Sequence, residues 1–120
     1  EIQWFSGKED YTEGIHMLQQ TYQIPLILLS MGRDGSRAYY KDMLVEVPAF
    51  LQKNTIETTG AGDTFGACCL HHILKYGLDN LTKQQLKEML TFANAAASII
   101  TTRKGALRVM PSLEEIQRLL

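Results

Sequence analysis

The sequence predicts an α/β fold, and three observations point to it. Segments with helical and strand-like patterns alternate in the first half of the chain, and the second half contains long helical patterns. The apolar run at residues 24–29 is continuous, which is typical of a strand buried on both faces, and it is far shorter than a membrane span. At 120 residues the chain forms one domain or a piece of one.

Helical signals come first. Residues 1–7 contain three large apolar side chains before Gly7, as expected at the end of a helix. Asp10, with Glu13 three positions later, resembles a capping box, and apolar residues then recur at helical spacing. The pattern predicts a helix over residues 11–22.

Strand signals follow. Pro25 prevents the helix from continuing, and residues 26–31 are expected to form a buried, parallel strand. The dipeptide Asp34-Gly35 is a strong turn signal. Strands over residues 37–41 and 44–47 would then form an antiparallel hairpin.

The second half is mainly helical. A helix over about residues 62–76 would end at Gly77, and Thr82 would cap the next helix. That helix becomes almost wholly small and apolar at residues 93–100, so it must pack closely on several sides. Ser112 would start a terminal helix that runs to Leu120.

The chain is organised around the stretch 58–66, a glycine-rich turn that runs directly into a helix. The first amide groups of a helix have no intrahelical acceptor and attract anions. Without a Cβ atom, Gly60 and Gly62 would let the backbone approach a phosphoryl oxygen. Asp63 has the wrong charge for a simple phosphate cradle, but it fits a site where an alcohol must lose its proton. An ordinary capped helix start is the alternative.

Other positions also allow two interpretations. For Gly32 and Gly35, turn geometry is a sufficient reason, and a second interpretation comes only from the family resemblance given below. Asn94 is either a hydrogen-bonded core amide or a ligand contact. Cys68 and His72 could face the same way on their helix, but two ligands fall short of a closed zinc site, and packing is the expected role of the cysteines.

Charge and composition disfavour several classes of partner. Twelve basic and thirteen acidic side chains leave the chain near neutral without a basic stripe, so we expect no nucleic-acid or membrane binding. Two adjacent cysteines cannot form a disulfide framework, which suits a cytoplasmic location. No signal peptide opens the chain, and because it begins at Glu1 without Met, we expect the start of the natural protein to be missing.

Two segments resemble one known family. ETTGAGDTFGACCL is similar to the second signature, DTTGAGDTF, of the ribokinase-like (PfkB) carbohydrate kinases, with seven consecutive matches over residues 59–65. Glu57 replaces the usual Asp, and Cys68 the usual Gly or Ala. FANAAASIITTRKGAL is similar to the family segment FANAAAxxxxTRxGA, and GALRVMPSLEEI to the tail of bacterial fructokinases.

The resemblance implies a fold. Residues 1–120 would be the C-terminal, nucleotide-binding part of a ribokinase-like, Rossmann-type, three-layer α/β/α domain with a short antiparallel hairpin. The N-terminal sugar-binding part and the lid would lie outside the chain. Family members usually form homodimers through the lid strands, which implies a homodimer for the full-length protein.

The resemblance also implies an activity, which is transfer of the γ-phosphoryl group of ATP to a sugar hydroxyl. The tail points to a fructokinase that makes fructose 6-phosphate. Ribose, 2-keto-3-deoxygluconate or a nucleoside as acceptor, or a non-catalytic nucleotide-binding module, remain alternatives, and the isolated fragment should be inactive. A dinucleotide-binding oxidoreductase is disfavoured because no GxGxxG follows a strand.

Site residues are carried over by matching positions. Asp63 would be the catalytic base, and the backbone amides around Gly60, Ala61 and Gly62 would form an anion hole for the migrating phosphoryl group. SMGRDG is similar to the family's TxGxxG element, which lines the nucleotide phosphates. The nucleotide-binding residues would then be Ser30, in place of the usual Thr, with Gly32, Gly35 and Asn94.

Metal ions are implied as well. Mg²⁺ would bridge the ATP phosphates. A monovalent cation, K⁺ in many relatives, would be held by Glu57, Thr59 and the backbone near Gly105, although Arg108-Val109 replaces the usual Pro-Ser nearby. Glu1 stands where the family's NxxE motif places its Glu near the Mg²⁺.

Overall fold

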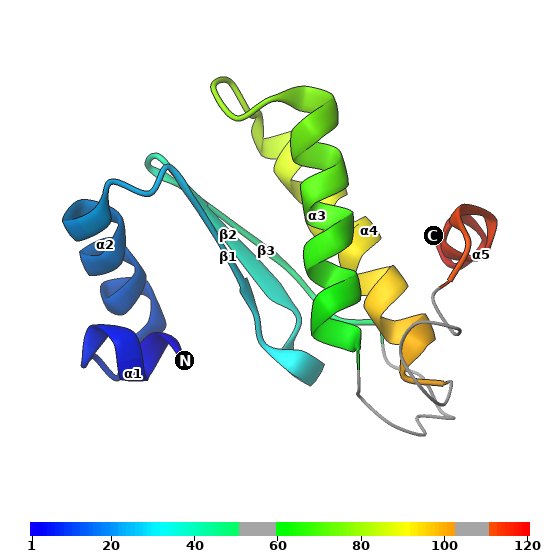
Figure 1. Ribbon diagram of the computed structural model, residues 1–120, viewed down its shortest axis with the longest axis horizontal. Helices are drawn as coiled ribbons and strands as arrows, with labels where there is room; N and C mark the ends of the chain where they lie inside the picture. The colour runs from blue at the N-terminus through cyan, green and yellow to red at the C-terminus, as the bar shows by residue number, and fades with distance from the viewer. Residues whose placement is uncertain (51–59, 103–110) are drawn as a thin grey trace.

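The computed structural model describes residues 1–50, 60–102 and 111–120. Figure 1 shows three layers, in which a small sheet separates one helix pair, α1 and α2, from another, α3 and α4. The elements are α1 (Ile2–Ser6), α2 (Tyr11–Tyr22), β1 (Leu26–Ser30), the 3₁₀ turn η1 (Gly32–Asp34), β2 (Ser36–Tyr40), β3 (Met43–Val47), α3 (Ala61–Tyr76), α4 (Lys83–Ile100) and α5 (Leu113–Leu119). Across these ranges, no helix is both long and apolar enough to cross a membrane.

The helix positions agree closely with the sequence patterns. The helix predicted over residues 11–22 is α2, and the predicted caps Asp10, Thr82 and Ser112 each accept a hydrogen bond from a backbone amide of the first turn. The last two form complete capping boxes. α3 starts one residue before the expected position and ends at Tyr76, and Gly77, with a φ of 79°, is its C-cap residue. Local hydrogen bonding therefore determines where these helices begin and end.

The predicted direction of the first strand is wrong for the described strands. Residues 26–31 predict a buried, parallel strand, but β1 pairs antiparallel with β2, with Leu26 opposite Tyr40, and its residues are half-buried or exposed. Strand order in the sheet is β1-β2-β3, and the expected hairpin of β2 with β3 is confirmed. Parallel neighbours need a crossover of a dozen or more residues, whereas η1 makes only a tight turn between β1 and β2.

β2 is the central strand and binds the helix layers on both sides. Successive strand residues face opposite sides. The hydroxyl of Tyr39 lies 3.1 Å from that of Thr12 in α2, and Gln19 donates a hydrogen bond of 3.0 Å to the carbonyl of Tyr39. On the other side, the hydroxyl of Tyr40 donates to the carbonyl of Leu78, between α3 and α4, at 2.6 Å. Both tyrosines are buried, so these bonds fix the layers to the sheet.

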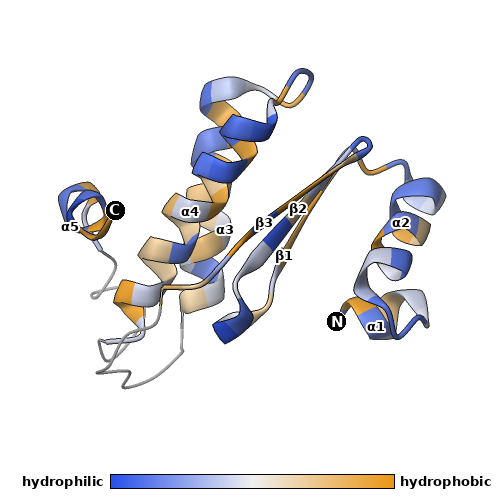
Figure 2. Cartoon of the chain, turned by 180° about the vertical axis from the view of Figure 1, so that it is seen from behind, coloured by the Kyte–Doolittle hydropathy of each residue, from blue (hydrophilic) through white to orange (hydrophobic). Residues whose placement is uncertain are grey.

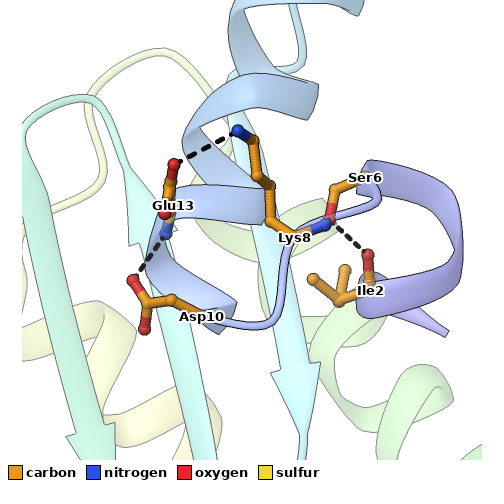
Figure 3. A network of polar contacts seen from close by, with 5 residues as sticks. All are labelled: Ile2, Ser6, Lys8, Asp10 and Glu13. Carbon is orange, nitrogen blue, oxygen red and sulfur yellow. Dashed lines mark hydrogen bonds and ion pairs between the residues drawn. The ribbon is translucent and has the colours of Figure 1, made fainter.

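A short polar network joins α1 to α2 (Figure 3). The Ser6 hydroxyl donates to the carbonyl of Ile2 at 2.7 Å and accepts from the amide of Lys8 at 3.1 Å. The carboxylate of Asp10 accepts from the amide of Glu13, whose own carboxylate lies 3.4 Å from the Lys8 ammonium. These hydrogen bonds contribute more to holding the turn between the helices than the exposed ion pair does.

The main core lies between the sheet and the α3–α4 pair. Figure 2 shows hydrophilic and hydrophobic residues mixed along α2, on the other face of the sheet, where the buried residues of that helix are Gly14 and Ile15. Small residues in α4 allow close approach of its neighbours, and Ala95 and Ala96 pack against Ile116 of α5. The buried side chains of the main core are Ala38, Tyr40, Val45, Val47, Phe65, Cys69, Leu81, Leu86, Met89, Leu90 and Ala93.

Candidate functional site

A cavity of about 410 Å³ opens where four segments meet. The turn after β1, the segment that follows β3, the first turn of α3 and the C-terminal half of α4 each provide part of its wall. A cavity of this size accommodates a small-molecule ligand. Six of the residues predicted to bind ligand line it, from segments far apart in the sequence: Ser30, Gly32, Gly35, Ala61, Gly62 and Asn94.

The first turn of α3 gives the cavity a set of backbone amides. Gly60 precedes the helix with a φ of 84° and caps it without a side-chain hydrogen bond. The first intrahelical bond is donated by the amide of Thr64 to the carbonyl of Gly60, at 2.9 Å. The amides that precede Thr64 therefore point out of the helix end, where Ala61 and Gly62 line the cavity. This end of the helix attracts a negatively charged group.

Asp63 lies in the same turn and is exposed. It does not line the cavity, unlike its neighbours Ala61 and Gly62. Consecutive helix residues are rotated by about 100° around the axis, so the carboxylate projects to a different side of the helix end from the cavity wall. A group bound in the cavity and a group held by Asp63 would therefore approach the same amides from two sides.

The 3₁₀ turn η1 and the residue after it contain two glycines, and the structure accounts for glycine at the two positions in different ways. Gly32 has a φ of 57°, and a Cβ atom there would meet nothing within 4 Å. Gly35 has a φ of 94°, and a Cβ atom there would lie 2.2 Å from the carbonyl oxygen of Val47 and 2.9 Å from the Cα atom of Pro48. The packing of the chain alone therefore requires glycine at position 35, whereas at position 32 only the backbone angle favours it.

We expect Gly35→Ala to lower the free energy of unfolding by about 3 kcal/mol or more, because it combines a strained backbone with a clash against β3. Gly32→Ala adds only left-handed strain, of about 1 kcal/mol. Urea unfolding of both variants measures the difference. Equal losses would contradict the close approach of Gly35 to the end of β3.

Asn94 is buried and faces both the cavity and the end of β3. Its side-chain nitrogen donates hydrogen bonds to the carbonyl oxygens of Val47, at 3.3 Å, and Pro48, at 3.1 Å. Asn94 is therefore a hydrogen-bonded core amide, and it also lines the cavity. The strand that it contacts is 46 to 47 residues earlier in the chain.

The cavity lining combines a charged side chain with apolar ones. Arg33 of the glycine turn supplies a guanidinium, and Phe50, Phe65 and Ala97 supply apolar surface. The hydroxyl groups of α4 in the lining donate within that helix, that of Ser98 to Ala95 at 2.8 Å and that of Thr101 to Ser98 at 2.7 Å. The cavity thus suits a ligand with an anionic part and a flat apolar part.

Part of the lining was not predicted from the sequence. A signal exists for the α4 residues, since they follow Asn94 at helical spacing, and for Phe65, which lies one turn after Ala61. Arg33 stands between the two predicted glycines. Ala49 and Phe50 follow β3 without any motif, so no sequence signal indicates them. The missed residues are Arg33, Ala49, Phe50, Phe65, Ala97, Ser98 and Thr101.

Of the predicted metal ligands, the structure describes only Glu1. Glu57, Thr59 and Gly105 lie outside the described residues. Glu1 is exposed at the start of α1, which Figure 1 places across the sheet from α3. In the described ranges, no group of three His, Cys, Asp or Glu side chains is arranged to hold a metal ion.

The cysteines of α3 lie away from the cavity lining. Cys69 belongs to the main core, and burial, together with the neighbouring Cys68, raises its thiol pKa to about 12. Burial also raises the pKa of Cys68. Both groups are therefore neutral thiols at physiological pH, which disfavours a nucleophilic role and agrees with packing. The ring of His72 bonds to the carbonyl of Cys68 through Nδ1, at 3.0 Å.

Comparison with known proteins identifies close similarities. Fructokinase-1 of Zea mays is 31% identical over 120 residues, which are 100% of this chain and 37% of that protein. The fructokinase of Klebsiella pneumoniae is 33% identical over 119 residues, or 98% of this chain and 38% of that protein. The chain therefore spans little more than a third of the length of these relatives.

Solved structures share the fold. The fructokinase of Vibrio cholerae O395, crystallised with fructose, ADP and calcium ion, superimposes with a TM-score of 0.86 at 26% identity, over 100% of this chain and 38% of that one. Arabidopsis thaliana ribokinase superimposes with a TM-score of 0.80 at 24% identity, over 98% of this chain and 37% of that one. Residues 1–113 match the pfkB family carbohydrate kinase domain. The resemblance predicted from two sequence segments is thus confirmed, and the chain belongs to the pfkB family of carbohydrate kinases.

Proposed function

We propose that the protein is an ATP-dependent fructokinase and that these residues form its nucleotide-binding side. One observation carries the proposal, which is that a single cavity unites the glycine turn, the first amides of α3 and the Asn94 face of α4, with an exposed carboxylate beside it. Fructose as the acceptor is supported by relatives that are 31% and 33% identical and bear the name fructokinase. It is also supported by the similar Vibrio cholerae structure with bound fructose and ADP.

The polarity of the cavity would orient the nucleotide. The adenine ring would lie against the apolar wall formed by Phe50, Phe65 and Ala97. The phosphates would extend toward Arg33 and the first turn of α3, where backbone amides and a guanidinium provide hydrogen bonds to anionic oxygens. Gly32 and Gly62 would leave room for that approach, since a Cβ atom at either position meets nothing of the protein itself.

The reaction would then take place at the exposed end of α3. The acceptor hydroxyl would be held by Asp63, which takes its proton as the new oxygen–phosphorus bond forms. The bond from the γ-phosphorus to the bridging oxygen breaks, and ADP leaves with that electron pair. The amides of Ala61 and Gly62 would stabilise the charge on the equatorial oxygens. When bound, Mg²⁺ would neutralise the phosphate charge, and Glu57, Thr59 and Gly105 stay as proposed ligands of K⁺.

We further propose that residues outside this chain supply the sugar contacts. The chain covers 37% and 38% of the related fructokinases. Large apolar side chains are also uncovered on two helices, with Trp4 81% exposed on α1 and Leu74 79% exposed on α3. On each helix a neighbouring apolar side chain is exposed as well, Phe5 beside Trp4 and Leu70 one turn before Leu74, and such a patch commonly packs against another part of a protein. The isolated chain would then bind ATP without phosphorylating a sugar.

A panel of acceptors tests the proposal. With ATP and Mg²⁺, the full-length protein should phosphorylate fructose with a kcat/KM about tenfold or more above those for ribose, 2-keto-3-deoxygluconate and adenosine. A coupled assay for ADP gives the rates, and the isolated chain serves as the control without acceptor contacts. Preference for another sugar would overturn the fructokinase assignment. Failure with every acceptor would overturn sugar phosphorylation itself.

A further inference from the structure

The end of β3 is held by a hydrogen-bonded amide on one side. Asn94 is only 7% exposed, and its Nδ2 atom faces the carbonyl oxygens of Val47 and Pro48. A carbonyl oxygen cannot donate, so the group that faces these two acceptors must be the NH₂ group, and its nitrogen lies within hydrogen-bond distance of both. The amide nitrogen is therefore engaged by the backbone at the end of β3.

The same segment is held by a close contact on the other side. A Cβ atom at Gly35 would lie 2.2 Å from the oxygen of Val47, 2.9 Å from the Cα atom of Pro48 and 3.0 Å from the nitrogen of Ala49. The chain from Val47 to Ala49 is thus held between the start of β2 and the middle of α4. The next residue is Phe50, and Ala49 and Phe50 both line the cavity.

We propose that Asn94 is a positioning residue for the nucleotide cavity, acting through the end of β3 rather than by contact with the nucleotide. Its two hydrogen bonds fix the direction in which the chain leaves the strand, and this direction places the side chain of Phe50 in the cavity wall. The inference rests on the proposed function, because the wall matters only if a nucleotide base packs against it. In this role the Asn94 amide holds the backbone at the end of β3 and does not contact the adenine ring directly.

Two variants separate positioning from contact. Asn94→Asp keeps the shape of the side chain but replaces the NH₂ group with an oxygen that repels the two carbonyls. Phe50→Ala removes the wall that Asn94 is proposed to position. Thr91→Ala is the matched control, since the Thr91 hydroxyl also lies on α4, donates to the carbonyl of Lys87 within the helix, and is absent from the cavity lining.

Steady-state kinetics of the full-length protein with fructose give the first readout. Asn94→Asp should raise the KM for ATP by about tenfold or more and change kcat by less than about threefold, because the wall affects nucleotide binding more than transfer. In the Phe50→Ala background, the same substitution should change the KM by less than about twofold, since positions that act through one another are not additive. Thr91→Ala should leave both constants within about twofold.

If Asn94→Asp raises the KM for ATP equally in the wild-type and Phe50→Ala backgrounds, the proposal is overturned in favour of direct contact between Asn94 and the nucleotide. Exchange of the Asn94 side-chain amide protons, measured by NMR in the wild-type protein, needs no variant to fold. Positioning requires slow exchange before ATP is added, whereas fast exchange that slows only with ATP would overturn it. Absence of ATP-dependent phosphorylation in the wild-type protein would instead count against the proposed function, so the two failures are distinct.

Discussion

Replacement of Asp63 by Asn should lower the kcat of the full-length protein by about 10²–10⁴-fold, which is the usual contribution of a positioned general base. Asn keeps the size of the side chain and can still hydrogen-bond to the acceptor hydroxyl, but it cannot take the proton. Asp63 is exposed and lies outside the cavity lining, so no packing is lost. The affinity for ATP should be kept or rise, because the substitution removes a negative charge near the proposed phosphate position.

The measurements are kcat with saturating fructose and ATP, and the dissociation constant of ATP by calorimetry. Asp79→Asn is a suitable control because it makes the same charge change in another exposed residue, just after the opposite end of α3. It should change kcat by less than about threefold. Retention of turnover in Asp63→Asn would show that another group acts as the base. Loss of ATP affinity together with turnover would indicate a binding role for Asp63.

The sequence predicts local structure well because local structure has local causes. The caps at Asp10, Thr82 and Ser112 bond to amides three residues later, so the pattern and the structure contain the same information. The direction of β1 has a different cause. A continuous apolar run is compatible with either direction, and the length of the turn after residue 30 decides it.

In the site, too, features with local causes are predicted from the sequence and features with long-range causes are not. The family segments are sufficient to name six residues that line one cavity. They do not distinguish Gly32 from Gly35, since the difference is the approach of the Val47 carbonyl, 12 residues later in the sequence. Nor do they reveal the partners of Asn94, which lie in a strand 46 to 47 residues away. The part of the site that depends on long-range packing, including Phe50, requires coordinates.

Gly62 provides the sharpest contrast between what the fold requires and what the proposed reaction requires. It is exposed, it lies in the first turn of α3, and an added Cβ atom would meet nothing within 4 Å. Its φ is not positive, so alanine can adopt the same conformation. Glycine within a helix is less favourable than alanine by about 0.5–1 kcal/mol. The fold alone would therefore favour alanine at this position.

Gly62→Ala should consequently stabilise the protein and impair catalysis. We expect the free energy of unfolding to rise by up to about 1 kcal/mol. Alanine keeps its amide, but the added methyl group would stand where the phosphoryl group is proposed to approach the helix amides. Keeping the phosphoryl group from even one such donor should lower kcat by about 10²–10³-fold. Thermal unfolding and steady-state kinetics of the full-length protein give both quantities.

Gly66→Ala is the matched control for Gly62→Ala. Gly66 lies one turn further along α3, is also exposed with open space around its Cα atom, and does not line the cavity. It should show a similar gain in stability and leave the KM for ATP within about threefold. If Gly62→Ala alone raises the free energy of unfolding and lowers kcat, then glycine is needed at this position because it lets the ligand approach the backbone. If Gly62→Ala is both more stable and fully active, a Cβ atom at this position does not obstruct the reaction. That result would remove these amides from the proposed mechanism.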